Sequence, residues 1–362
     1  MIEAIDGLEN VIAAHTLLSE VDGDAGRLVI RGHSLADLAG VRAFEWTMRL
    51  LWEGHFEDLP DDLAAPLGRA RAEAFEEVAA LDTHLSDMTT MEIVRALLAR
   101  LADGDALSTA LRLAAAPAVF TAAAVRAQKG QAPIAPDVRL GHAADLLRML
   151  RGAPASDAEA RALDTYLVTV IDHGLNASTF AARVVASTHA GLASAVIAGL
   201  CALKGPLHGG APGPVIEMLN GVTAPEEARA WLEGALARGD RLMGFGHRVY
   251  RVRDPRADAL KAAVKRLLTA QKVPPGRLRL AEAVESAALT ILAERKPGRS
   301  LATNVEFYTA LLLEALGLPP EAFTCTFAAG RAAGWIAHAR EQVATGRLIR
   351  PQSRYVGPRA ID

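Results

Sequence analysis

Nearly the whole chain divides into helix-length segments separated by glycine and proline breaks. Hydrophobic residues make up 51% of the 362 residues, but aromatic residues make up only 5%. The apolar content is therefore mostly alanine, leucine and valine, which suits closely packed helices better than a β-sandwich. The pattern predicts an all-α protein, with helices at 43–52, 91–101, 108–128, 141–150, 158–170, 225–238, 256–269 and 279–294.

Two segments depart from this pattern. Residues 27–32 have the composition of one short strand. Residues 184–203 carry no formal charge, and their length matches the roughly 20 residues of a membrane-spanning helix. They are rich in small side chains and include His189. We therefore expect a buried helix or helix pair in a soluble bundle, and no membrane partner.

Charge and cysteine content narrow the possible ligands. The formal net charge of −3 provides no basic footprint for nucleic acid. Local arginine clusters would have to hold any anionic ligand. Cys201 and Cys325 lie in apolar sequence, which favours two buried thiols over a disulfide or a metal pair. The acidic N-terminus lacks a secretion signal, so we expect a cytoplasmic protein.

The segment 244–256, Gly-Phe-Gly-His-Arg-Val-Tyr-Arg-Val-Arg-Asp-Pro-Arg, concentrates chemical groups. It places His247 between a glycine-rich turn and four arginines. The glycines permit close approach of the backbone to a ligand, and arginine matches carboxylates and phosphates. A histidine in this setting can donate to, or accept from, a reacting oxygen. Taken alone, the segment also fits a turn followed by a solvated basic helix start.

Four further motifs accompany this segment. His208 lies in Lys-Gly-Pro-Leu-His-Gly-Gly-Ala, and His173 lies in Asp-His-Gly-Leu-Asn-Ala-Ser-Thr. Asn-Val-Glu-Phe follows at 304–307, and Gly-Arg-Leu-Ile-Arg-Pro at 346–351. From about residue 7 to residue 358, the set closely resembles the citrate synthase family. The combination of the two histidine–glycine motifs is far more specific than a lone glycine motif.

The resemblance implies a citrate synthase-like fold. It would contain a large helical domain, 1–207 with 312–362, and an inserted small helical domain, 208–311. The active cleft would lie between them, and the protein would form a two-fold homodimer.

Condensation of an acyl thioester with a keto acid requires a base, a donor for the enol, a donor for the ketone and clamps for the carboxylates. In the family these correspond to Glu306 as base, His208 at the enol and His247 at the ketone. The predicted oxaloacetate ligands are His173, Arg256, Arg331 and Arg350, with Arg350 reaching into the partner's site. The predicted CoA contacts are Leu242, Met243, Gly244 and Gly246 along the adenine, and Arg251 at a phosphate.

Acetyl-CoA and oxaloacetate are then the expected partners. No separate cofactor is expected. No metal is predicted either, since the histidines lack close helical spacing and no cysteine pair supports them. We also expect His208, near a helix N-terminus, to remain neutral.

Three positions depart from the usual family pattern. Glu306 replaces an aspartate, and its extra methylene moves the carboxylate by more than about one ångström. Residues 303–306 also have the spacing of a capping box, and a helix N-terminus would keep the carboxylate ionised. Pro212 and Gly213 replace Asn-Glu, and Val170 replaces a histidine.

The leading prediction is condensation of acetyl-CoA with oxaloacetate to citrate and CoA. Use of propionyl-CoA by a 2-methylcitrate synthase is the nearest alternative. Citryl-CoA cleavage is another. A catalytically weak paralogue that binds CoA or a dicarboxylate is the alternative from a different class.

Overall fold

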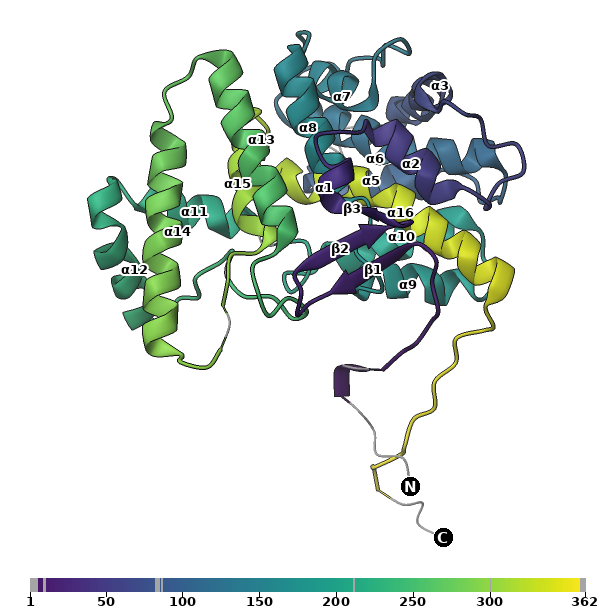
Figure 1. Ribbon diagram of the computed structural model, residues 1–362. Coiled ribbons are helices and arrows are strands. Elements are labelled where there is room, and N and C mark those ends of the chain that lie inside the picture. The colour runs from purple at the N-terminus through teal and green to yellow at the C-terminus, as the bar shows by residue number, and fades with distance from the viewer. Residues whose placement is uncertain are drawn as a thin grey trace.

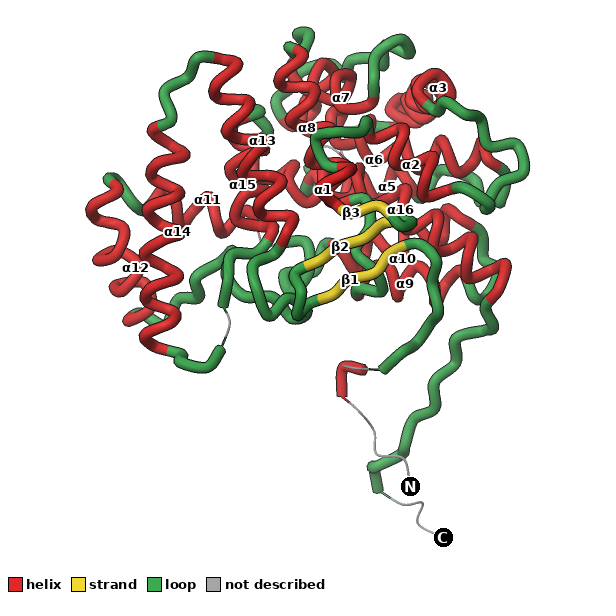
Figure 2. Tube along the Cα trace, viewed as in Figure 1, coloured by secondary structure: helices red, strands yellow, loops and turns green. Residues whose placement is uncertain are grey.

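The computed structural model describes residues 6–8, 11–81, 85, 87–210, 212–299 and 301–358. Helices dominate, as the all-α prediction requires (Figure 2). The strands are β1 Ser19–Asp22, β2 Arg27–Ile30 and β3 His33–Ser34. The α-helices are α1 Leu35–Leu38, α2 Phe44–Trp52, α3 Ala64–Phe75, α5 Thr90–Leu98, α6 Leu107–Gln128, α7 His142–Arg151, α8 Asp157–Val170, α9 Ala177–Ala186, α10 Leu192–Leu203, α11 Pro212–Gly221, α12 Ala228–Ala237, α13 Pro255–Gln271, α14 Gly276–Arg295, α15 Val305–Ala315 and α16 Phe323–Thr345. Short 3-10 turns are η1 Asp6–Leu8, η2 Glu76–Ala80, η3 Pro225–Glu227 and η4 Pro320–Ala322.

The predicted helices are all present, with ends that differ by up to a few residues. The segment predicted at 225–238 is divided into η3 and α12. The segment predicted at 91–101 ends at Leu98, as α5. Local caps explain several boundaries: Ser156 opens α8 with a capping box, and Gly152 closes α7 in the left-handed conformation.

The prediction of a single strand was incomplete. β2 is the middle strand of a small antiparallel sheet in the order β1-β2-β3. Its Leu28 and Ile30 side chains are buried in the core, while Arg27 is exposed. β1 reads Ser-Glu-Val-Asp, which has too few apolar residues for a strand signal.

Two long helices form the centre of the main helical body. α6 and α16 are buried over most of their length, and α2, α3, α5, α8, α9 and α10 pack around them. α11, α12 and α14 lie together at the other side of the molecule, and α13 and α15 lie between the two groups (Figure 1). α13 contacts both α8 and α15, so it joins the two groups.

The uncharged segment 184–203 contains the end of α9 and the whole of α10, and it is only partly buried, so the expected buried helix or helix pair is confirmed only in part. α9 and α10 are separated by a break at Ser187–Gly191, where His189 has φ 61° and Gly191 has φ 97°. The expectation of two buried thiols was wrong for Cys201, which is exposed on α10, and right for Cys325. α6 is the one described helix long and apolar enough to span a bilayer by length and composition, and 83% of that window is buried inside the protein.

Candidate active site

Two segments distant in sequence meet near the end of α8 and the start of α13. His173 follows α8, His247 lies in the loop between α12 and α13, and Arg256 is in the first turn of α13. The ring centroids of His173 and His247 are 5.6 Å apart. His173 Nε2 lies 3.1 Å from Tyr250 Oη, and Arg256 Nη2 lies 3.2 Å from His247 Nε2. The structure thus brings together three of the residues selected from sequence, and adds Tyr250 to them.

Hydrogen bonding defines the tautomer of His247. Its Nδ1 accepts from the backbone N–H groups of Val249, at 3.0 Å, and Tyr250, at 3.1 Å. The ring proton therefore lies on Nε2, which faces another donor, Arg256 Nη2. Two donors that face each other at this distance are satisfied by an acceptor oxygen that lies beside them, within reach of both. Burial, reinforced by the charge of Arg256, lowers the pKa of His247 to about 4, so the ring is neutral at pH 7.

His208 lies in the turn before α11 and contacts Ser178, at the start of α9. Its Nε2 is 2.8 Å from Ser178 Oγ, and that hydroxyl is also 2.8 Å from Asn176 Oδ1. Asn176 Oδ1 already accepts the backbone N–H groups of Ser178 and Thr179. The Ser178 hydroxyl donates to this same oxygen, and it also lies within hydrogen-bonding distance of His208 Nε2.

His208 is neutral, as expected, but for a different reason. Burial is the main cause that lowers its pKa to about 4, followed by the charges of Arg331 and Arg256. α11 begins only at Pro212, so the predicted helix N-terminus lies several residues further along the chain.

The two buried arginines have different partners. Arg256 pairs with Asp254 through Nε–Oδ1 at 3.0 Å and Nη2–Oδ2 at 2.8 Å. Arg331, on α16, is 1% exposed and donates Nε–H to the Val170 carbonyl. Its Nη2 is buried and has no hydrogen-bond partner within the described chain. Burial lowers the pKa of Arg331 to about 10, which still leaves it charged at pH 7. A buried cationic donor without a partner favours an anionic ligand.

Glu306 is buried in the first turn of α15, and the predicted capping box was wrong. The cap is Asn304, whose Oδ1 accepts the Glu306 N–H at 3.1 Å. Thr303 Oγ1 instead donates to Glu285 at 2.7 Å. The expectation of an ionised carboxylate was also wrong. Burial raises the pKa of Glu306 to about 8, and the charges of Arg256 and Arg331 only partly oppose this shift. The carboxyl is therefore mostly protonated at pH 7.

The loop predicted to lie against the CoA adenine is joined to the start of α15. Asn304 donates its backbone N–H to Gly244 O at 3.0 Å and its side-chain amide to Gly246 O at 2.8 Å. Gly244 has φ 87°, and a Cβ there would approach Phe307 Cβ within 2.9 Å, so this position requires glycine. Leu242 is buried, Met243 is half-buried and Arg251 is exposed.

Arg350 is not part of this cluster within one chain. It is exposed, in the segment after α16 that extends away from the body (Figure 1). Two hydrogen bonds hold the start of that segment. Gln342 Nε2 donates to Arg347 O at 3.0 Å, and Ile349 N–H donates to Ser187 Oγ at 3.1 Å.

Sequence reasoning missed several neighbours of the site. Tyr250 and Asp254 lie inside the selected motif, and Ser178 lies inside the His173 motif, so inspecting the polar residues there would have identified them. Trp335 donates Nε1–H to Ser178 Oγ at 3.2 Å and has no sequence signal. Tyr166 has a buried hydroxyl without a hydrogen-bond partner in the described residues. It lies one turn before Val170, on the same face of α8.

A buried polar network fixes the residue before His173. Asp172 Oδ1 is 3.1 Å from His338 Nε2, and His338 Nδ1 is 3.0 Å from Arg183 Nη1. The same Arg183 nitrogen donates to Glu341 Oε2 at 2.6 Å. Because Nδ1 accepts from an arginine, His338 donates its Nε2 proton to Asp172.

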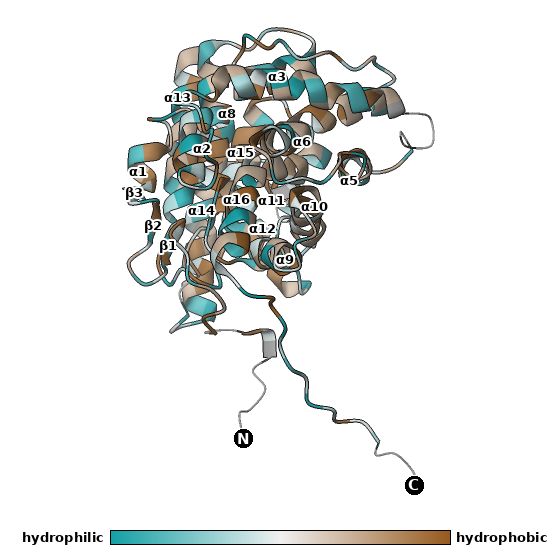
Figure 3. Ribbon diagram, turned by 90° about the vertical axis from the view of Figure 1, so that its right-hand side faces the viewer, coloured by the Kyte–Doolittle hydropathy of each residue, from teal (hydrophilic) through white to brown (hydrophobic). Residues whose placement is uncertain are grey.

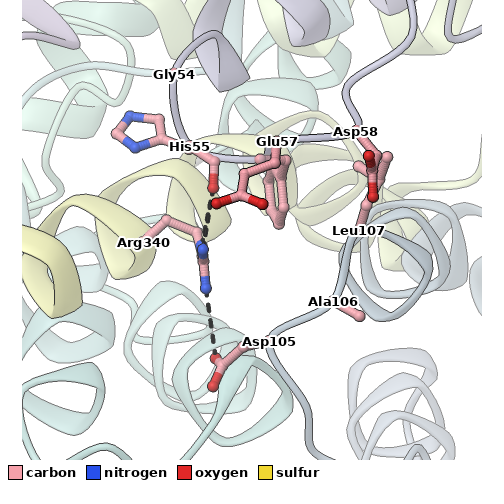
Figure 4. A pocket seen from close by; sticks show the side chains of 9 residues that line it. Gly54, His55, Glu57, Asp58, Asp105, Ala106, Leu107 and Arg340 are labelled. Carbon is pink, nitrogen blue, oxygen red and sulfur yellow. Dashed lines mark hydrogen bonds and ion pairs between the residues drawn. The ribbon is translucent and has the colours of Figure 1, made fainter.

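A cavity unrelated to this cluster lies elsewhere. It has a volume of about 560 Å³ and surrounds Arg340, which donates to His55 O and faces Asp105 (Figure 4). Arg340 is nine residues, or about 13 Å, along α16 from Arg331. The buried histidines and arginines identify the site better than cavity size does. Among the residues that the structure describes, no group of His, Cys, Asp and Glu side chains could hold a metal ion.

Comparison with known proteins gives matches over nearly the whole chain. A family model described as "Citrate synthase, C-terminal domain" matches residues 7–352. The citrate synthase of Haloferax volcanii is 39% identical, over 98% of this chain and 96% of its own. The 2-methylcitrate synthase of Mycobacterium tuberculosis is 35% identical, over 97% of this chain and 90% of its own. A solved ternary complex of carboxymethyl coenzyme A and oxaloacetate with citrate synthase from Thermoplasma acidophilum superposes with a TM-score of 0.86 at 26% identity, covering 99% and 98% of the two chains.

Proposed function

This chain belongs to the citrate synthase family of acyltransferases, and on that premise we propose that it condenses acetyl-CoA with oxaloacetate. Water would then cleave the thioester bond of the condensed product, which gives citrate and CoA. The observation that carries the proposal is the pair of facing donors, His247 Nε2 and Arg256 Nη2, 3.2 Å apart. A ketone and its adjacent carboxylate provide the acceptor oxygens that such a pair requires. The Thermoplasma relative was solved with oxaloacetate and a CoA analogue, which supports the same ligand classes here.

We assign the keto acid to the arginine-rich side of the site. Arg256 and the unpartnered Nη2 of Arg331 would bind its carboxylates, and His173 would orient the pocket through Tyr250. His247 would donate to the ketone oxygen. A neutral imidazole that presents a proton stabilises the developing alkoxide without itself having to ionise.

The thioester would lie between His208 and Glu306. Glu306, once ionised, removes a proton from the methyl group, and His208 donates to the enol oxygen. Ser178 Oγ, 2.8 Å from His208 Nε2, would orient the ring. The Leu242–Gly246 backbone and Arg251 would hold the coenzyme.

We propose that residues 208–311 move against 1–207 and 312–362 when the keto acid binds. His208 lies on one side of this division and its partner Ser178 on the other, so the contact that this structure shows between them would break on opening. Compaction in solution scattering on addition of oxaloacetate would support this motion, and an unchanged profile would count against it.

The test is a thiol-release assay with oxaloacetate and either acetyl-CoA or propionyl-CoA. A preference for acetyl-CoA supports citrate formation, whereas a preference for propionyl-CoA makes the enzyme a 2-methylcitrate synthase. His208→Ala should lower kcat while leaving the dissociation constant of oxaloacetate nearly unchanged. Arg331→Ala should raise that dissociation constant. Binding without turnover of either thioester would overturn the proposal.

A further inference from the structure

The β1–β2 hairpin contacts two segments of the candidate site. At one end, Ser19 Oγ donates to the Asp172 carboxylate and accepts the Gly174 N–H at 3.0 Å. Val21 Cγ2 would lie 3.3 Å from a Cβ placed on Gly174. β1 therefore contacts the residues on either side of His173, Asp172 and Gly174, in the short turn after α8.

The turn of the hairpin contacts the segment that follows His247. Arg251 donates its backbone N–H to Gly23 O at 2.9 Å. A Cβ on Gly23 would lie only 2.2 Å from Val249 O, and one on Gly26 would lie 2.7 Å from Val252 Cγ2. Gly23 is not among the residues with positive φ, so space alone requires glycine there. The hairpin turn is thus in backbone-to-backbone contact with the 249–253 segment.

Strand pairing and burial of β2 fix the distance between the Ser19 end of the hairpin and its turn. β1 pairs with β2 from Ser19↔Ile30 to Asp22↔Arg27, and Leu28 and Ile30 anchor β2 in the core. Three residue steps of strand separate the contact at Ser19 from the turn, which is about 10 Å. One of the two segments held in this way carries His173. The other carries His247 and Tyr250, whose rings contact His173.

We propose that the β1–β2 hairpin is a positioning clasp, which holds the His247 segment against the His173 corner at the spacing required for keto-acid binding. This inference rests on the function proposed above. The contact at the turn is one backbone hydrogen bond with van der Waals packing. Such a contact can favour one arrangement of the site and still open when the 208–311 region moves.

The decisive variant is Gly23→Ala. The added methyl group cannot fit beside Val249 O, so the turn must separate from the loop and the Arg251–Gly23 hydrogen bond is lost. We expect KM for oxaloacetate to rise roughly tenfold with a smaller change in kcat, as for an interaction lost from substrate binding. Asp24→Ala is the matched control, because Asp24 is exposed on the same turn, and it should behave as wild type.

Two further measurements separate a clasp from simple destabilisation. Val252→Ala removes contact without a clash and should raise KM in the same direction by about twofold. Ser19→Ala loosens the other end, and its effect combined with Gly23→Ala should be less than the product of the two single effects. Amide exchange at Arg251 should be slow in wild type with oxaloacetate and fast in Gly23→Ala.

The outcomes are distinguishable. If Gly23→Ala matches Asp24→Ala in KM and in Arg251 exchange, the clasp proposal is wrong. If wild type turns over neither thioester, the proposed function is wrong. Oxaloacetate binding by calorimetry and Arg251 exchange still test the clasp in that case, since neither measurement depends on turnover.

Discussion

At the scale of single residues, burial of Glu306 decides the pH range in which its carboxyl group could act as the proposed base. A base must be ionised, yet burial raises its pKa to about 8. The pKa values of His208 and His247, each lowered to about 4 by burial, keep both rings neutral between pH 6 and 9. Glu306 is therefore the group among these three that titrates in that range.

The first prediction follows from this titration. Because the base role proposed for Glu306 requires the deprotonated form, kcat/KM should rise about tenfold per pH unit below pH 8 and level off above it. Steady-state rates at fixed ionic strength measure this profile. A profile that is flat from pH 6 to 9 would remove Glu306 from the role of base.

The second prediction concerns Glu306→Gln. Condensation should fall by roughly 10²–10⁴, the usual worth of general-base catalysis. The folded protein binds its proton more tightly than the unfolded chain, so Glu306 lowers stability as pH rises from about 4.5 to about 8. The variant should therefore melt above wild type at pH 8 and close to it at pH 4.5. Melting curves at both pH values provide the check, and a lower melting temperature at pH 8 would contradict the argument.

At the scale of elements, sequence pattern predicted the helices well because Gly/Pro breaks and apolar periodicity are local signals. It predicted β2 from Leu28 and Ile30 but missed β1, whose strand conformation depends on pairing with β2. The capping box failed because Asn304 Oδ1 accepts the Glu306 N–H, while Thr303 Oγ1 donates to Glu285. The three histidines were found because their motifs are specific, whereas Trp335 reaches Ser178 only through tertiary packing.

The third prediction concerns the C-terminal end of α16. A Cβ on Gly346 would lie 1.9 Å from Gln342 Nε2, so this amide crosses directly over the chain to reach Arg347 O. Gln342→Met should free the arm that carries Arg350 and raise KM for oxaloacetate about tenfold, if Arg350 binds substrate. The melting temperature should also fall by several degrees, because Gln342 Oε1 accepts the buried Arg183 Nε–H at 2.9 Å, and leaving that charged donor unpaired costs about 1–3 kcal/mol.

Mixing two defective chains would show where the arm acts. Gln342→Met releases the C-terminal segment that carries Arg350 but keeps Arg331. Arg331→Ala keeps that segment in place but lacks a proposed carboxylate ligand. If Arg350 acts in the partner's site, half of randomly mixed dimers contain one complete site, which restores about a quarter of wild-type activity. Mixtures no more active than the separate variants would place the arm on its own chain, or outside the site altogether.

At the scale of the whole molecule, α9 and α10 present a partly exposed apolar face. Phe180, Ala181 and Val184 share one side of α9, while Ile197 and Cys201 share one side of α10. Figure 3 shows both helices at the edge of the bundle. An apolar face of this kind, next to the base of the Arg350 arm, fits a second copy of the chain.

The fourth prediction tests that assembly. Ile197→Glu should halve the mass measured by light scattering and reduce turnover, because a charge at the centre of an apolar interface is not tolerated. Val138→Glu is the matched control, since Val138 is an exposed aliphatic residue elsewhere. A wild-type monomer at micromolar concentration would rule out the dimer.

The exposed thiol on α10 also affects how the enzyme can be assayed. Reagents that reveal released CoA react with any accessible thiolate, so Cys201 should give rapid colour before substrate is added in every chain whose α10 face is uncovered. Cys325 should remain silent, because burial raises its pKa to about 12. The amount of this initial colour measures the fraction of chains in the sample whose α10 face is exposed to solvent. Cys201→Ser should supply a clean baseline for every rate compared above.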